Sequence, residues 1–379
     1  MNEMAEFHRA DPVWEMRQQL AEIAAAPADA PMGLPGRFYV DDAFFRHECE
    51  TVLRRGWHSV GRADELPRAG DFLTLTLLGE PLIIVRDGRE IRALSNVCRH
   101  RGMPVASGTG NAKRFVCPYH AWAYGRDGAL LRAPRMKNAG FDLKTCRLGE
   151  FACVERMGFV YVCLAPAPPD IDAQLAGLDA VIQPYRPEDY RIVHAETEIW
   201  QTNWECLVEN FMEGYHLSVV HPETLHGYTP TGLSRKGPAG PGYTSYFANY
   251  PKNIAPRGHG AAELDAAARH RSTLFSVFPC QVTSVAASLL VSLSIRPVRA
   301  AAVEVRWTMS VYGDDLDEET IAERVRLWQE VNREDREKLE SMQMALGSVH
   351  AVGGPLAGAD YEGTVRDFLL WLAGEMAAV

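Results

Sequence analysis

The strings CRHRG (98–102) and CPYHAW (117–122) each pair one cysteine with one histidine, spaced C-x-H in the first and C-x-x-H in the second. The four residues are Cys98, His100, Cys117 and His120, and residues 101–116 separate the two pairs. Two such pairs on neighbouring loops suit a [2Fe-2S] cluster in which two imidazoles replace two thiolates on one iron. Because imidazole donates electrons less strongly than thiolate, this cluster has a higher potential than an all-cysteine one. The sequence therefore predicts a one-electron relay.

A structural zinc site is the alternative for these four residues, since zinc accepts the same ligand types. Zinc fingers usually place two cysteines before two histidines, whereas each pair here mixes the two. The turn-forming residues Gly102, Pro104 and Pro118 flank both pairs, as expected for two loop tips that close over a cluster. We therefore favour the iron-sulfur interpretation.

A second group of metal-binding residue types lies in NWECLVENFMEGYHLSVVHP (203–222), which we expect to form a helix from about Asn203 to Val220. His216 and His221 are five residues apart, so on a straight helix their rings would diverge by about 140°. Pro222 disfavours the α conformation at His221 and lets that residue turn back toward His216. A solvated helix face is the alternative, because Glu205, Glu209, Glu213 and His216 share one stripe.

The third ligand of this site is sought on the long helix expected from Glu318 to about Leu346. Asp335 lies on its apolar stripe, whereas Glu334 lies one step off, toward solvent. A carboxylate on an apolar stripe must be protonated, paired or bound to metal, and a buried ion pair with arginine is the alternative. Two histidines and one carboxylate on one iron form a facial triad that leaves positions open for dioxygen. The stripe comprises Ile321, Val325, Trp328, Val331, Asp335, Leu339 and Met342.

Taken together, these motifs resemble those of the oxygenase component, or alpha subunit, of Rieske non-haem iron oxygenases. The cluster pattern of that family fits Cys98, His100, Cys117 and His120, with Ala121 in place of its usual glycine. Its catalytic motif matches Glu213, His216, His221 and Asp335 residue by residue. The resemblance implies that both histidines and Asp335 bind a mononuclear Fe(II), and that Glu213 and Asp335 serve catalysis. It also implies that Glu213 bridges His216 to His120 or His100 of a neighbouring subunit in a homotrimer.

The same resemblance implies a terminal oxygenase that hydroxylates or demethylates a small organic substrate with dioxygen. NAD(P)H would act through a separate reductase or ferredoxin, since the chain has no convincing Gly-rich dinucleotide fingerprint. A glutamate at position 213 resembles the subgroup that oxidises quaternary amines. The alternatives are an aromatic-ring cis-dihydroxylating dioxygenase and, more remotely, a Rieske electron carrier without oxygenase activity.

The substrate is expected to be a quaternary amine or an aromatic acid. A quaternary ammonium requires an aromatic cage, which the aromatic residues between positions 243 and 278 would provide. The same residues would also stack an aromatic acid, with Arg235, Lys252 or Arg257 binding its carboxylate. Pro279-Cys280 lacks the Pro-Asn pair associated with choline and betaine relatives. The cage candidates are Tyr243, Tyr246, Phe247, Tyr250, Phe275 and Phe278, several of which would equally serve as core.

The pattern along the chain predicts an α+β protein, with a small antiparallel β domain that carries the cluster motifs and a larger domain of strands and long helices. The resemblance implies that the first is the Rieske domain and that the second is a helix-grip catalytic domain with an antiparallel sheet and long helices. The expected divisions are 1–37, an N-terminal helical segment packing on the catalytic domain, 38–165, the Rieske domain, and 166–379, the catalytic domain. A helix is expected at 11–25, a Gly- and Pro-rich loop at 227–260, strands at 273–279, 284–297 and 302–312, and a short helix near the C-terminus.

Composition excludes some other functions. A net charge of -10 makes nucleic-acid binding improbable, and no stretch is apolar enough to span a membrane. Eight cysteines without scaffold-like spacing favour a reducing, cytoplasmic location. A basic segment around the cluster motifs is a candidate docking surface for an acidic electron donor, and solvated loop charges are the alternative. Its residues are Arg99, Arg101, Lys113, Arg114, Arg126, Arg132, Arg135 and Lys137.

Overall fold

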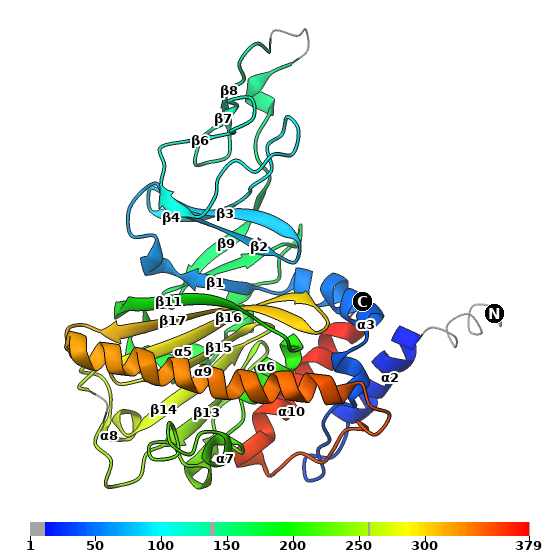
Figure 1. The fold of residues 1–379 in the computed structure, drawn as a ribbon, viewed down its shortest axis with the longest axis vertical. Helices are drawn as coiled ribbons and strands as arrows, with labels where there is room; N and C mark the ends of the chain where they lie inside the picture. Colours follow the sequence, from blue (N-terminus) through cyan, green and yellow to red (C-terminus); the bar gives the residue numbers. More distant parts are fainter. Residues whose placement is uncertain (1–11, 137–140, 257, 379) are drawn as a thin grey trace, which may run out of the picture. The chain divides into compact units, whose positions relative to one another are not determined.

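The computed structural model describes residues 12–136, 141–256 and 258–378 (Figure 1). Its chain divides into two compact units. The smaller unit runs from Arg55 to Pro168, and the larger unit contains the residues before Arg55 and those after Pro168. Lys137 and Arg257, which the sequence analysis considered as binding residues, lie outside the described residues.

The smaller unit is built from antiparallel strands. Its described residues form one sheet in the order β1-β10-β9-β4-β3-β2-β5 and a second small sheet in the order β6-β7-β8. Two apolar clusters fill it, one of which includes Cys98 and Cys117. The strands are β1 (His58–Arg62), β2 (Asp71–Leu77), β3 (Glu80–Asp87), β4 (Glu90–Ser95), β5 (Thr109–Asn111), β6 (Phe115–Val116), β7 (Ala123–Tyr124), β8 (Leu130–Arg132), β9 (Glu150–Arg156) and β10 (Phe159–Cys163).

The larger unit contains an antiparallel sheet, and its longer helices lie on one face of that sheet. The described strands follow the order β11-β17-β16-β15-β14-β13-β12, and α9 lies along the sheet together with α6 and α10 (Figure 1). The strands are β11 (Tyr190–Trp200), β12 (Ser234–Lys236), β13 (Tyr243–Asn249), β14 (Arg271–Val277), β15 (Gln281–Ala286), β16 (Leu289–Arg299) and β17 (Ala302–Tyr312). The helices are α2 (Pro12–Ala24), α3 (Asp42–Thr51), α4 (Ile171–Gln174), α5 (Leu178–Ile182), α6 (Trp204–Phe211), α7 (Leu217–Val220), α8 (Ala266–Arg269), α9 (Glu318–Leu346) and α10 (Ala359–Ala377).

The α+β class predicted from the sequence is confirmed, as are the helices α2 and α9 and the strand β17. The loop expected at 227–260 instead contains β12 and β13, because its glycines and prolines lie at the ends of these strands. The apolar run 284–297 is two strands, β15 and β16, which turn at Ala287 and Ser288. The C-terminal helix α10 is longer than predicted, with 19 residues.

Four of the seven residues predicted for the inward stripe of α9 are buried: Trp328, Val331, Asp335 and Leu339. Met342 was wrongly assigned to that stripe, since its exposed fraction is 46%. Ile321 and Val325 are only half-buried. The buried part of α9 is therefore its middle, where Asp335 lies.

Candidate metal centres

The two Cys-His motifs form two tight turns of similar construction in the smaller unit. The first lies between β4 and β5, where the Gly102 amide donates to the Cys98 carbonyl at 2.9 Å. The second lies between β6 and β7, where the Ala121 amide donates to the Cys117 carbonyl at 3.0 Å. Ala121 has a φ of 58°, in the left-handed region that favours glycine. The unusual alanine therefore keeps the backbone conformation of a glycine.

The side chains of these turns converge with the sulfurs inside and the imidazoles outside. Cys98 and Cys117 are each 2% exposed, whereas His100 and His120 are exposed. The His100 and His120 Nδ1 atoms lie 3.1 Å apart. That separation suits two nitrogen ligands of a single iron, with the buried thiols left for the second iron. The four residues therefore fit a Rieske-type cluster.

Tyr124, a residue of β7, supports the first turn and was missed by the sequence analysis. Its hydroxyl lies 3.3 Å from the Cys98 Sγ and accepts a hydrogen bond from the Arg99 amide at 3.0 Å. Burial, together with the contact with Cys98, raises the pKa of Tyr124. The sequence offered little indication of this role, because a tyrosine on a predicted strand is usually interpreted as a core residue.

The second centre lies in the larger unit, where the chain breaks between α6 and α7. The prediction of one helix from Asn203 to Val220 was wrong: α6 ends at Phe211, and His216 is the N-cap residue of α7. A Cβ on Gly214 would lie 2.2 Å from the Ser234 Oγ, so only glycine fits this turn against β12. The break, and not Pro222 alone, brings the two histidine side chains to one place.

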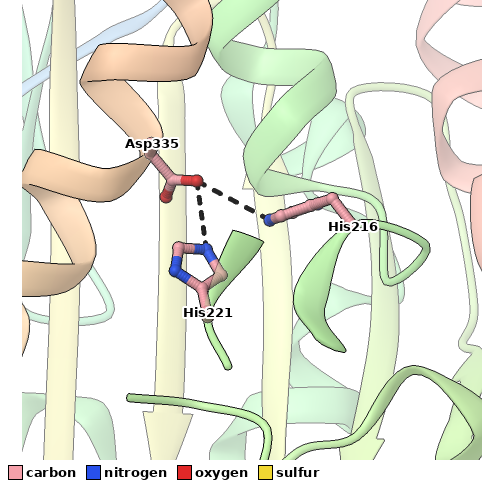
Figure 2. Close-up of side chains that lie close together, drawn as sticks. All are labelled: His216, His221 and Asp335. Carbon is pink, nitrogen blue, oxygen red and sulfur yellow. Dashed lines mark ion pairs between the residues drawn. The ribbon is translucent and has the colours of Figure 1, made fainter. Parts of the chain in front are cut away.

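His216, His221 and Asp335 face one another, and Figure 2 shows the two imidazoles directed at the Asp335 carboxylate on α9. The His221 Nε2 is 3.1 Å from the Asp335 Oδ1, and the His216 Nε2 is 3.7 Å from the same oxygen. One ligand atom from each residue lies within 4.8 Å of the others. The partners of Asp335 are therefore imidazoles and not the arginine considered from the sequence.

A carboxylate holds the far side of each imidazole. The His216 Nδ1 contacts the Glu213 Oε1, and the His216 amide donates to the Glu213 Oε2 at 3.1 Å. The His221 Nδ1 lies 2.7 Å from the Glu334 Oε2, which also accepts from the Thr224 hydroxyl at 2.7 Å. These contacts fix the ring orientation and aim both Nε2 atoms at Asp335. The assignment of Glu334 to a solvent-facing position was wrong.

The electrostatics of this group suit a cation. Burial lowers the pKa of His216, but the hydrogen bond and charge of Glu213 outweigh burial and the net pKa is raised. Burial raises the pKa of Asp335, but its close contact with His221 and the charges of both histidines outweigh burial, and the net pKa is lowered. The His221 Nε2 and Asp335 Oδ1 are buried yet make no hydrogen bond of acceptable geometry among the described residues. A metal ion bound between these atoms would satisfy both.

Comparisons with known families agree with this geometry. Residues 56–152 match the family described as the Rieske [2Fe-2S] domain, and residues 187–378 match the ring hydroxylating alpha subunit (catalytic domain). The chain belongs to the ring-hydroxylating Rieske oxygenase alpha subunits. The residues of both candidate centres of this Rieske oxygenase chain lie within the matched ranges. Its cofactors are those of the family, a Rieske cluster and a mononuclear iron.

Curated relatives of this Rieske oxygenase include two enzymes named for quaternary amines. The glycine betaine monooxygenase oxygenase subunit of Chromohalobacter salexigens is 37% identical over 211 residues, which are 54% of this chain and 47% of the relative. The carnitine monooxygenase oxygenase subunit of Escherichia coli K12 is 38% identical over 195 residues, 50% of this chain and 52% of the relative. The chain thus spans about half the length of the curated relatives it matches.

Solved structures share the fold over almost the whole chain. The quaternary ammonium Rieske monooxygenase CntA superposes with a TM-score of 0.82 and 23% identity, covering 93% of this chain and 98% of its own. Naphthalene 1,2-dioxygenase from Rhodococcus gives a TM-score of 0.82 and 20% identity, covering 96% and 98%. Within the described residues of the Rieske oxygenase chain, no helix is long and apolar enough to cross a membrane.

The aromatic residues considered as a substrate cage do not form one group. Successive residues of a strand point to opposite faces of its sheet, so Tyr246 and Phe247 of β13 face apart. The Tyr246 hydroxyl donates to the backbone carbonyl of Glu213, beside the metal centre. Tyr243 and Phe247 instead line a separate cavity on the other face. In this Rieske oxygenase, the cage candidate Tyr246 therefore contacts the segment that carries His216.

Proposed function

We propose that this chain is a terminal oxygenase that takes electrons from a separate NAD(P)H-dependent reductase and uses dioxygen to hydroxylate or demethylate a small organic substrate. The observation that carries the proposal is the convergence of His216, His221 and Asp335, with both Nδ1 atoms already held by carboxylates. This arrangement supports the roles proposed for these residues as ligands of a mononuclear iron. When bound, such an iron supplies dioxygen activation, and a Rieske cluster supplies single electrons.

The protein's own contribution would be to hold the three ligands, His216, His221 and Asp335, in place. Three protein ligands leave coordination positions for dioxygen and for substrate nearby. Glu213 and Glu334 accept hydrogen bonds from the Nδ1–H groups, which fixes each ring in the tautomer whose Nε2 is free to bind metal. In the smaller unit, we propose that Cys98, Cys117, His100 and His120 bind the cluster.

Electron transfer between subunits is part of the proposal. His100 and His120 are exposed, so a neighbouring chain can approach their free Nε2 atoms. We propose a homotrimer in which Glu213 accepts a hydrogen bond from one of these atoms on a neighbouring subunit while it holds His216 of its own. The solved structure of a quaternary ammonium Rieske monooxygenase reveals insights into inter-subunit electron transfer, which supports this role. The basic residues near the turns, among them Arg99 and Arg101, are exposed and suit an acidic electron donor.

For the substrate we propose a quaternary amine. The relatives named for glycine betaine and carnitine support this choice over an aromatic acid. An N-demethylase of dimethyl phenylureas from Sphingobium, 33% identical over 200 residues, supports removal of a methyl group as the outcome. We also propose a cytosolic location, because none of the eight cysteines, all of which lie in the described residues, forms a disulfide.

The test is NADH-driven oxygen uptake with a matched reductase over glycine betaine, carnitine, choline and aromatic carboxylates, followed by product mass. We expect coupled uptake with a quaternary amine and a product that has gained one oxygen atom or lost one methyl group. The variant Asp335→Asn serves as the control and should show no coupled uptake. Gain of two oxygen atoms by an aromatic substrate would favour the dihydroxylating alternative, and absence of uptake with every substrate would favour the electron carrier.

Glu213→Gln tests the bridging role separately. We expect this variant to bind both metals and to accept an electron at the cluster, but to reoxidise the cluster at least about tenfold more slowly when substrate and dioxygen are added. Stopped-flow absorbance of the reduced cluster measures this step. Glu213→Asp keeps the charge and should recover part of the rate. Reoxidation at the wild-type rate in Glu213→Gln would contradict the bridge.

A further inference from the structure

The larger unit has a cavity lined by Tyr243 and Phe247. It lies on the face of the sheet opposite to the face from which the Tyr246 side chain projects. Its volume is about 480 Å³, within the range of small-ligand sites. Aromatic side chains from two elements line it: Tyr185 precedes β11, and Tyr243 and Phe247 lie on one face of β13. The Tyr185 hydroxyl forms a hydrogen bond with the Thr273 hydroxyl at 2.9 Å, so this polar group is already paired within the protein. The walls are therefore apolar ring surfaces.

Arg271, the first residue of β14, supplies a cation to this cavity. Its guanidinium lies over the Phe247 ring at 3.9 Å from the centroid. Stacking holds the group flat but satisfies none of its N–H donors. Its side chain has no hydrogen bond or ion pair among residues 12–136, 141–256 and 258–378, and its Nε atom is buried without an acceptor. A buried donor without a partner is costly, which indicates a missing acceptor.

Tyr243 adds a neutral donor to the same cavity. Its hydroxyl has no hydrogen-bond partner in the described part of the chain, and burial raises its pKa, so it remains protonated. The acidic residues of the lining are engaged elsewhere: the Asp265 carboxylate accepts from the Ala268 amide at 2.7 Å and caps α8, and Glu263 lies 3.8 Å from Arg186. Arg271 and Tyr243 are thus the donors of this lining for which the described residues show no acceptor.

We propose that this cavity binds a small organic carboxylate, whose oxygens bond the Arg271 guanidinium and the Tyr243 hydroxyl and whose carbon portion packs on the aromatic walls. A planar guanidinium recognises a carboxylate through two parallel hydrogen bonds. The inference goes beyond the proposed function and requires neither metal. The bound carboxylate is either a betaine that resembles the proposed substrate or a different organic acid. Titration with a betaine and with another carboxylate distinguishes these two ligands.

The test is isothermal titration calorimetry on the metal-loaded, full-length protein with two matched pairs of probes. Benzoate is compared with its neutral isostere benzamide, and glycine betaine with choline. We expect binding of benzoate, glycine betaine or both, and none of benzamide or choline at this cavity. Repeating the titration with Asp335→Ala separates this cavity from the metal centre, since binding here should persist without the mononuclear iron.

Variants then locate the binding. Arg271→Gln should weaken carboxylate binding by about tenfold or more, and Tyr243→Phe by about threefold to tenfold, because each removes hydrogen bonds to a charged ligand. Arg326→Gln, an exposed arginine of α9, is the control and should bind as the wild type does. Tyr243→Phe removes one atom and keeps the test valid if Arg271→Gln fails to fold. Equal binding of benzamide and benzoate, or undiminished binding in both variants, would overturn the proposal.

Discussion

Glu334 contacts a proposed metal ligand without being one itself. Its carboxylate holds the Nδ1 of His221 and the hydroxyl of Thr224. In Glu334→Gln the ionised acceptor is lost, so His221 becomes a less basic and less firmly oriented ligand. We expect the dissociation constant for Fe(II) at the triad to rise about tenfold to hundredfold, as is usual when such a supporting group is removed. Titration of the apoprotein with Fe(II) measures it.

The control for this prediction is Glu337→Gln, which changes a glutamate of the same helix whose side chain is 59% exposed. It should leave Fe(II) affinity unchanged. Wild-type affinity in Glu334→Gln would mean that packing alone orients His221.

At the scale of single residues, the sequence analysis found Asp335 because a carboxylate on an apolar stripe needs a partner. It missed Glu334, which lies about 100° further around α9. Whether that side of the helix meets solvent depends on the segment of His221 and Thr224, which covers it in the structure. Periodicity within one helix cannot report which distant loop packs beside it.

At the scale of elements, the turn between α6 and α7 decides whether the histidines converge. In Gly214→Ala the new Cβ would overlap the Ser234 side chain, at 2.2 Å from its Oγ and 2.7 Å from its Cβ. We expect the free energy of unfolding to fall by about 1–3 kcal/mol, as for other overpacked positions. Urea denaturation measures it, and Fe(II) affinity should fall as well because the turn moves His216.

Two further variants make this prediction specific. Gly227→Ala is the control, since a Cβ there meets no atom within 4 Å. Adding Ser234→Gly to Gly214→Ala removes the overlapping atoms and should restore part of the stability. If the single variant is as stable as Gly227→Ala, the close approach of the turn to β12 is not a constraint.

The position of this turn was the part of the site least predictable from sequence. Pro222 gave a visible reason for the helix to end after His221, whereas the real break follows Phe211. Its cause is tertiary: the Gly214 amide donates to the Tyr361 carbonyl, and the Thr364 hydroxyl on α10 bonds the Met212 carbonyl. These acceptors and donors replace the helical hydrogen bonds, and they come from a helix about 150 residues away in sequence.

At the scale of the whole molecule, the larger unit buries carboxyl groups that should make its stability depend on pH. Glu48 on α3 and Glu205 on α6 are both 0% exposed, and burial raises the pKa of Glu48 to about 8 and that of Glu205 well above 4.5. Neither Glu205 oxygen has a donor among the described residues. The groups that face this pair are Tyr39, Cys49, Trp204, Cys206, Glu209 and Cys280, none of which is a cation.

The folded protein thus keeps protons that the unfolded chain releases above its ordinary glutamate pKa. Raising the pH from about 4.5 to about 8 therefore lowers the free energy of unfolding, by about 1.4 kcal/mol per pH unit for each proton retained. The double variant Glu48→Gln, Glu205→Gln removes this titration and should flatten the curve over the same interval. Urea denaturation at several pH values compares the two proteins, and an unchanged slope in the double variant would contradict the assignment.

Because the chain divides into two compact units, we expect the two proposed metal sites to be separable. All four cluster residues lie between Arg55 and Pro168, and His216, His221 and Asp335 lie in the other unit. We expect Cys117→Ser to lose the cluster's colour and sulfide but to retain the mononuclear iron, and Asp335→Ala to retain the cluster and lose only that iron. Iron and sulfide analysis with visible spectra measures both. Cys153→Ser, which changes a free cysteine outside the motifs, should keep both metals. Loss of both centres from either single variant would show that one unit cannot hold its metal without the other.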